Sequence, residues 1–94
     1  MNDLKLRGKI EAIRYIDEMN AIITLKTKKD NGGIFATMQS LPVTVTSSKI
    51  DELRKLKIGD TIFIVGRVIA KDETTCITIA DKIYYKDDYI VTEY

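Results

Sequence analysis

The stretch from Val43 to Ile69 constrains the fold most, because it places a strand, a short helix and a second strand in direct succession. Valine and threonine alternate over residues 43–46, which is the period-two pattern of a half-buried strand. Ser48 stands at an N-cap position, and apolar residues at helical spacing predict a short amphipathic helix over Lys49–Ile58. Gly59 can end that helix in a left-handed conformation.

The second strand of this stretch, Ile62–Ile69, has two different faces. Its first set of alternate residues is expected to face a core and consists of Ile62, Ile64, Gly66 and Val68. The other set faces outward and consists of Phe63, Val65, Arg67 and Ile69. A strand, a short helix and a long strand with a central glycine are typical of a small closed β-barrel with a helix at one end.

The run VTVTSSKIDELRKLKIGDTIFIVGRV resembles the third strand, helix and fourth strand of bacterial and phage-type single-stranded-DNA-binding proteins, which are OB-folds. AIITLKTK (21–28) resembles the second strand of that family, IADKIYY (79–85) its fifth, and LKLRGKI (4–10) can be aligned with its first. The resemblance implies an all-β, five-stranded OB-fold barrel with one short helix between strands three and four. We expect one domain over 1–94, in which 86–94 is a short C-terminal extension without the family's acidic tail.

Composition limits how such a barrel could bind a polyanion. Fifteen basic and fourteen acidic residues give a net charge of +1, so a phosphate-binding surface requires local segregation of charge. The single cysteine excludes an internal disulfide and favours a reducing compartment. No apolar run approaches the length of a membrane span, and we expect a cytoplasmic protein with no membrane association.

The residue types in the sequence do not indicate a catalytic site. The chain has no histidine and one cysteine, so sites rich in nitrogen or sulfur ligands for metals are not expected. Cys76 has no histidine to activate it and is interpreted as a small strand hydrophobe. We therefore expect no enzyme activity, no metal and no cofactor.

The first strand, expected over Leu4–Ile13, carries cations on one face. Its inward residues are expected to be Leu4, Leu6, Gly8, Ile10 and Ala12, and its outward cations are Lys5, Arg7 and Lys9. This row is either a solvated strand face or a track for a nucleic-acid backbone.

The second strand, expected over Ala21–Lys29, has Ile23 and Leu25 inside and Lys26, Lys28 and Lys29 outside. The sequence DNGG at 30–33 predicts a hairpin turn, and residues 34–38 form its returning arm. The resemblance implies that this hairpin grips DNA and carries Phe35. The alternative is that Phe35 folds back on the core or on a neighbouring subunit. Pro42 is expected at the start of the third strand.

Aromatic residues elsewhere have two interpretations each. Phe63 is on the outer face in step with Arg67 and Lys71, where it could stack on a base or contact another subunit. The fifth strand is expected over Thr74–Tyr85, and the tyrosines near its end either close the barrel edge or stack on bases; they are Tyr84, Tyr85 and Tyr89.

These observations predict a protein that binds single-stranded nucleic acid, DNA in the first place and RNA as the alternative, in replication, recombination or repair. The candidate site residues are Lys5, Arg7, Lys9, Lys26, Lys28, Lys29, Phe35, Phe63, Arg67 and Lys71. The outer row of the fourth strand predicts self-association into a homodimer or homotetramer. The alternative function is a protein-interaction OB module, such as an accessory subunit of a replisome or primosome.

Overall fold

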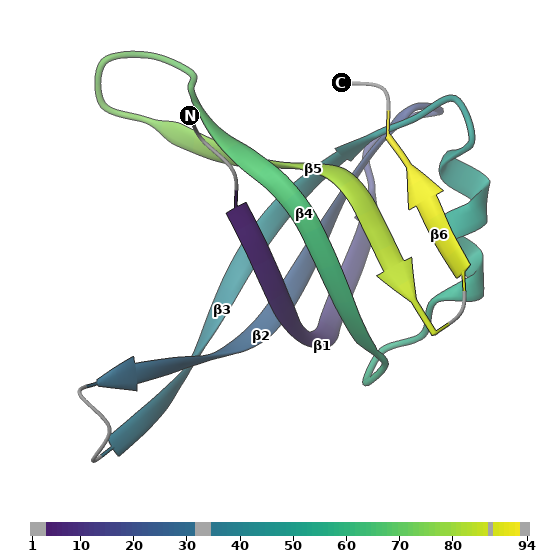
Figure 1. The fold of residues 1–94 in the computed structure, drawn as a ribbon. Coiled ribbons are helices and arrows are strands. Elements are labelled where there is room, and N and C mark those ends of the chain that lie inside the picture. The colour runs from purple at the N-terminus through teal and green to yellow at the C-terminus, as the bar shows by residue number, and fades with distance from the viewer. Residues whose placement is uncertain (1–3, 32–34, 87, 93–94) are drawn as a thin grey trace.

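The computed structural model describes residues 4–31, 35–86 and 88–92, and it describes only the backbone of 28–31, 35–38 and 91. The described part is almost entirely β-structure with one short helix (Figure 1). Its elements are β1 (Leu4–Tyr15), β2 (Asn20–Asn31), β3 (Phe35–Thr46), the 3-10 helix η1 (Ile50–Lys55), β4 (Thr61–Ala70), β5 (Cys76–Tyr85) and β6 (Asp88–Val91).

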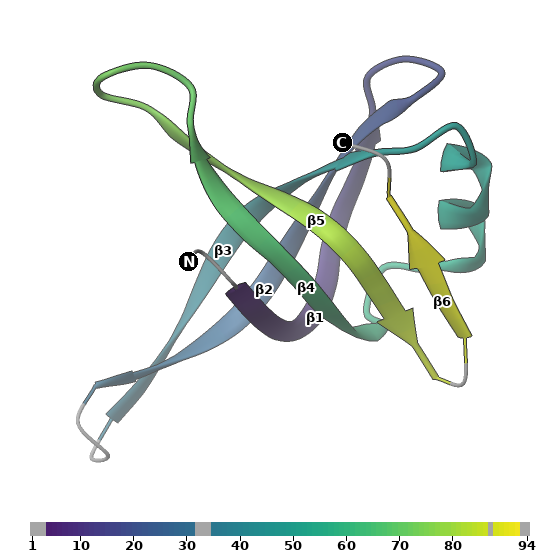
Figure 2. The same ribbon diagram turned by 45° about the horizontal axis from the view of Figure 1, so that its top comes forward.

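The strands form one sheet in the order β3-β2-β1-β4-β5-β6. A parallel bridge between Thr44 of β3 and Ile79 of β5 joins the two sides of the sheet and closes a barrel from β1 to β5. This is the expected five-stranded OB-fold, with the helix between β3 and β4. The hairpin of β2 and β3 continues beyond the barrel in both views (Figures 1 and 2).

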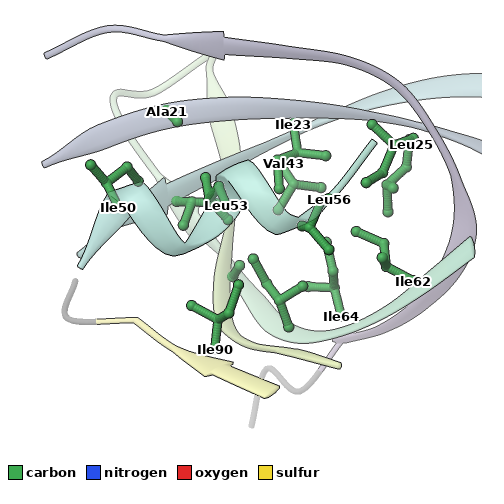
Figure 3. Packing of buried hydrophobic residues seen from close by; sticks show 14 residues of the cluster. Ala21, Ile23, Leu25, Val43, Ile50, Leu53, Leu56, Ile62, Ile64 and Ile90 are labelled. Carbon is green, nitrogen blue, oxygen red and sulfur yellow. The ribbon is translucent and has the colours of Figure 1, made fainter. Parts of the chain in front are cut away.

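The core lies inside the barrel and under the helix. As the alternation predicted, Ile23, Leu25, Ile62 and Ile64 are buried in it. The helix contributes Ile50 and Leu53, and Leu56 follows it; Figure 3 shows these side chains beside those of the strands. The helix therefore covers one end of the apolar interior and adds its own side chains to the core.

The helix is shorter than the expected Lys49–Ile58, and it is a 3-10 helix rather than an α-helix. Ser48 does not cap it: the residue before its first turn is Lys49, whose side chain makes no capping hydrogen bond. The backbone N–H of Lys49 instead donates to the Ser47 Oγ. Leu56 is already extended, so the three apolar side chains at helical spacing reach the core from a short 3-10 helix and the extended residue after it.

Gly59 has the expected left-handed backbone, with φ of 94°, but it lies in a turn after the helix. That turn is held by the Lys57 N–H, which donates to an Asp60 carboxylate oxygen at 2.9 Å. A loop of this kind returns the chain to the barrel at β4. The glycine thus ends the connection rather than the helix.

The expected inward position of Ala12 in β1 and the expected place of Pro42 in β3 were wrong. A β-bulge between Ile10 and Ala12 exposes Ala12 and turns Ile13 toward the core, because a bulge shifts the alternation by one residue. Pro42 lies in the middle of β3, opposite Thr24, and not at a strand start. β3 is bonded to β2 along its length and to β5 at one bridge, so its other edge leaves room for a residue without an N–H.

The C-terminal segment forms a strand that the sequence did not predict. β6 pairs with β5, and its Ile90 is buried in the core. β5 begins at Cys76 rather than Thr74, because the Asp72 carboxylate accepts hydrogen bonds from the N–H groups of Thr74 and Thr75 and holds both in a turn.

Candidate nucleic-acid interface

The outer face of β1 carries a row of exposed cations, as its alternation predicted. Lys5, Arg7 and Lys9 are all exposed, and Lys9 lies opposite Lys26 of β2. Among the described side chains, the cations that form ion pairs are Arg54, Lys55 and Arg67. In the described part of the chain, no carboxylate therefore neutralises Lys5, Arg7, Lys9 or Lys26.

The Lys9–Lys26 pair is unfavourable for folding by itself. Side chains directly opposite one another in an antiparallel pair are close, and like charges there destabilise a sheet. Two lysines in this position concentrate positive charge at the β1–β2 boundary. A bound polyanion would offset this repulsion, so the lysine pair suits the binding of phosphates better than it suits folding.

A row of aromatic rings lies beside the cations. In the register of the sheet, Arg7 of β1 is opposite Phe63 of β4, Phe63 is opposite Tyr84 of β5, and Tyr84 is opposite Tyr89 of β6. The Phe63 and Tyr84 ring centroids are 6.0 Å apart, and those of Tyr84 and Tyr89 are also 6.0 Å apart. We call Phe63, Tyr84 and Tyr89 the ring row.

Further cations surround the ring row. A groove of about 310 Å³ is lined by Arg7, Phe63, Tyr84 and Lys86 together with two residues of β4. The Lys82 ammonium lies 5.9 Å from the centre of the Tyr89 ring. A hydrogen bond with Tyr85 raises the pKa of Lys86 above its ordinary value, so this lysine stays charged over the neutral range.

Arg67 and Lys71 lie farther along β4 and beyond it. Arg67 forms an ion pair with Asp81 of β5, with 3.2 Å between its Nε and a carboxylate oxygen. Lys71 is exposed in the β4–β5 turn, where its N–H donates to the Thr75 carbonyl. Phe63, Arg67 and Lys71 therefore do not form one compact group, and their roles stay predictions.

Three other candidates lie on the β2–β3 hairpin. The backbones of Lys28 and Lys29 pair with Met38 and Thr37, and Phe35 begins β3 opposite Asn31. The side chains of Lys28, Lys29 and Phe35 fall outside the residues whose side chains the structure describes. Their assignment to the site is a prediction that rests on the sequence.

A hollow lined by acidic side chains lies beside the β1–β2 turn, in contrast to the cationic outer face of β1. This hollow of about 700 Å³ is lined by three carboxylates, Asp17, Glu18 and Asp51, along with Tyr15 and Arg54. The Arg54 guanidinium stacks over the Tyr15 ring at 5.0 Å and also pairs with Asp51. The hydrogen bond from the Met19 N–H holds the pKa of Asp17 below its usual value, so this hollow stays anionic near neutral pH.

Tyr84, Tyr89, Lys82 and Lys86 were not among the candidate residues predicted from sequence. Their clustering in the sequence was visible, but it fitted barrel closure as well as stacking. The exposure of the rings in the structure distinguishes the two interpretations: Tyr84 and Tyr89 are 36% and 56% exposed, whereas Tyr85 packs against the core.

Among the residues that the structure describes, none forms a helix with the length and apolar character of a membrane span. Those residues also contain no cluster of three or more histidine, cysteine or acidic side chains placed to hold a metal ion.

Comparison with known proteins gives similarity in structure alone. No protein-family model matches the chain, and no curated protein matches its sequence. A small single-stranded DNA binding protein from Mycoplasma pneumoniae has a TM-score of 0.65 and 18% identity, over 100% of this chain and 96% of that one. The SSB of Plasmodium falciparum, in complex with ssDNA, has a TM-score of 0.61 and 16% identity, over 99% and 96%.

The Stn1–Ten1 complex of S. pombe contains a chain with a TM-score of 0.65 and 15% identity, matched over 94% of this chain and 60% of that one. At these identities the comparisons show a shared OB-fold. The fold implied by the sequence resemblance to single-stranded-DNA-binding proteins is thereby confirmed.

Proposed function

We propose that this protein binds single-stranded nucleic acid, and DNA in particular, on the outer face of β1 and β4. The observation that carries the proposal is the register of the sheet. It places the exposed Arg7 of β1 opposite the Phe63 ring and the exposed Lys9 opposite Lys26. OB-folds bind single strands through cationic side chains along the phosphates and rings under the bases. Two of the similar structures are described as single-stranded-DNA-binding proteins, which supports this choice.

Binding on this face depends on local electrostatics rather than on bulk charge. The net charge of +1 gives the protein little general attraction for a polyanion. The charges are instead segregated: cations lie on the β1 face and carboxylates around the hollow beside Tyr15. We further propose that the protein acts in the cytoplasm in replication, recombination or repair, as a binding protein without catalytic activity.

Affinity is expected to fall steeply with salt. If Lys5, Arg7, Lys9 and Lys26 each contact one phosphate, the slope of log affinity against log salt is about −0.7 for each contact, or roughly −2.8 in total. Fluorescence anisotropy of a labelled oligo-dT across a salt series measures this slope, with a duplex of equal length as the control. A salt-independent affinity, or equal binding to the duplex, would support a protein-interaction module in place of this function.

We also propose that the chain forms a homodimer or homotetramer. At the end of the outer face away from the ring row, Ile69 of β4 is opposite Ile77 of β5, and both are only half-buried. The Arg67–Asp81 ion pair lies between this apolar pair and the rings. Sedimentation at roughly 50 µM, where micromolar interfaces are populated, is expected to show at least a dimer. Ile77→Lys should give a folded monomer, and a monomeric wild-type protein contradicts this proposal.

A further inference from the structure

The ring row is an exposed aromatic surface on three neighbouring strands. Phe63, Tyr84 and Tyr89 come from β4, β5 and β6, and the register aligns them across the strands. Tyr89 is more than half exposed. An aromatic side chain normally buries a large apolar area on folding, whereas Tyr84 leaves about a third of its surface in water and Phe63 is only half-buried. Such a surface fits a partner with flat apolar faces.

Charge decides which partner fits. Positive side chains border the ring row on several sides: Arg7 and Lys86 line the groove with Phe63 and Tyr84, and Lys82 lies beside Tyr89. A second copy packed here by two-fold symmetry would place the same cations against each other. A single-stranded nucleic acid offers flat bases and a negative backbone, so it complements both the rings and the cations.

We propose that the ring row is a base-stacking platform that takes one base on each ring from an extended single strand crossing β4, β5 and β6. This inference rests on the proposed function and assigns part of its site. The 6.0 Å between neighbouring rings is well above the rise of about 3.4 Å per nucleotide in a stacked strand. Consecutive bases must therefore separate to rest on consecutive rings, which a single strand can do and a duplex cannot.

β6 completes the platform because it holds Tyr89 in place. Ile90, the next residue, is buried in the core, and Asp88 forms a surface ion pair of 3.3 Å with Lys55 of the helix. After β6, the Thr92 hydroxyl lies against the carbonyl oxygens of Ala80 and Asp81. These contacts fix the strand on both sides of Tyr89. The C-terminal segment is thus assigned to the binding site as well as to the fold.

The test compares two double variants of the full chain. Tyr84→Leu/Tyr89→Leu keeps apolar bulk on β5 and β6 but removes the flat rings, whereas Tyr84→Phe/Tyr89→Phe keeps the rings. We expect the leucine variant to bind oligo-dT at least tenfold more weakly and the phenylalanine variant to bind within about twofold of wild type. Tyr15→Leu, which removes an exposed ring beside the anionic hollow, is the matched control and should bind normally.

Tyrosine emission gives a second measurement, because the chain has no tryptophan. Oligo-dT should quench the emission of the wild-type protein, and the leucine variant should lose much of that quenching. Unchanged affinity in the folded leucine variant overturns the platform while leaving the proposed function in place. A leucine variant that loses self-association but not affinity also overturns it, in favour of a second copy as the occupant. If the wild-type protein fails to bind oligo-dT at low salt, the proposed function itself fails.

Discussion

Replacing Gly66 with alanine is expected to lower the free energy of unfolding by about 3 kcal/mol or more, which is a large part of the stability of a small domain. A Cβ at this position would overlap the carbonyl oxygen of Ile79. That oxygen is part of the backbone of β5, and Ile79 also bridges to Thr44 of β3. β5 therefore cannot move away from β4 without opening the barrel where it closes.

Urea unfolding of the two proteins measures this difference, and Gly59→Ala provides the control. A Cβ at Gly59 would meet open space, so that substitution carries only the strain of a positive φ, roughly 1–2 kcal/mol. Equal losses of stability in the two variants would mean that β4 and β5 adjust freely at Gly66. A clearly larger loss in Gly66→Ala than in Gly59→Ala supports close approach of the two backbones as the reason for the glycine at position 66.

The inner faces of the strands could be predicted from the sequence because their alternation is a local property. Ile23, Leu25, Ile62 and Ile64 are inside, as period two required. The prediction from alternation failed where β1 has one residue more than its partner strand. At the bulge between Ile10 and Ala12 the pattern shifts, and nothing in the local sequence marks the extra residue, because its cause is the bending of β1 between two partner strands.

For the helix, the sequence predicted which side chains are buried but not the type or the length of the helix. Residues at helical spacing, Ile50, Leu53 and Leu56, are buried as expected, yet only Ile50–Lys55 are helical. The same three side chains reach the core from a six-residue 3-10 helix and the extended residue that follows it. Burial was therefore predictable from the pattern, whereas the type and length of the helix depended on the space left at the end of the barrel.

For the candidate site, the sequence could predict which face of a strand carries the cations. It could not predict which residues of neighbouring strands lie opposite one another. The row of Lys5, Arg7 and Lys9 followed from alternation within one strand. The Lys9–Lys26 pair and the ring row follow from strand register. β6 could not be predicted from the sequence either. The chain turns from β5 into β6 through Lys86, which has a φ of 54° that lysine rarely adopts.

Reversing two charges on β1, Arg7→Glu/Lys9→Glu, is expected to weaken binding of oligo-dT by about a hundredfold near 0.15 M salt. With about 0.7 ions released per phosphate contact, each contact contributes roughly fourfold to affinity at this salt concentration, so neutralising two removes about 15-fold. Repulsion between the new carboxylates and the phosphates adds to that loss. The fold should tolerate the change, since both side chains are exposed and the carboxylate introduced by Lys9→Glu would lie opposite Lys26.

A variant with the same net charge separates the site from the overall charge. Lys49→Glu/Lys57→Glu changes two exposed lysines that flank the helix, and it takes the net charge from +1 to −3, as the β1 variant does. Anisotropy titrations of both variants, with thermal unfolding to confirm that each is folded, should show a loss of less than about fivefold in the helix variant. If both variants lose affinity equally, binding follows net charge, and the outer face of β1 is not the backbone track. If only the β1 variant loses affinity, its salt slope should also be shallower by about 1.4, which is the contribution of two phosphate contacts.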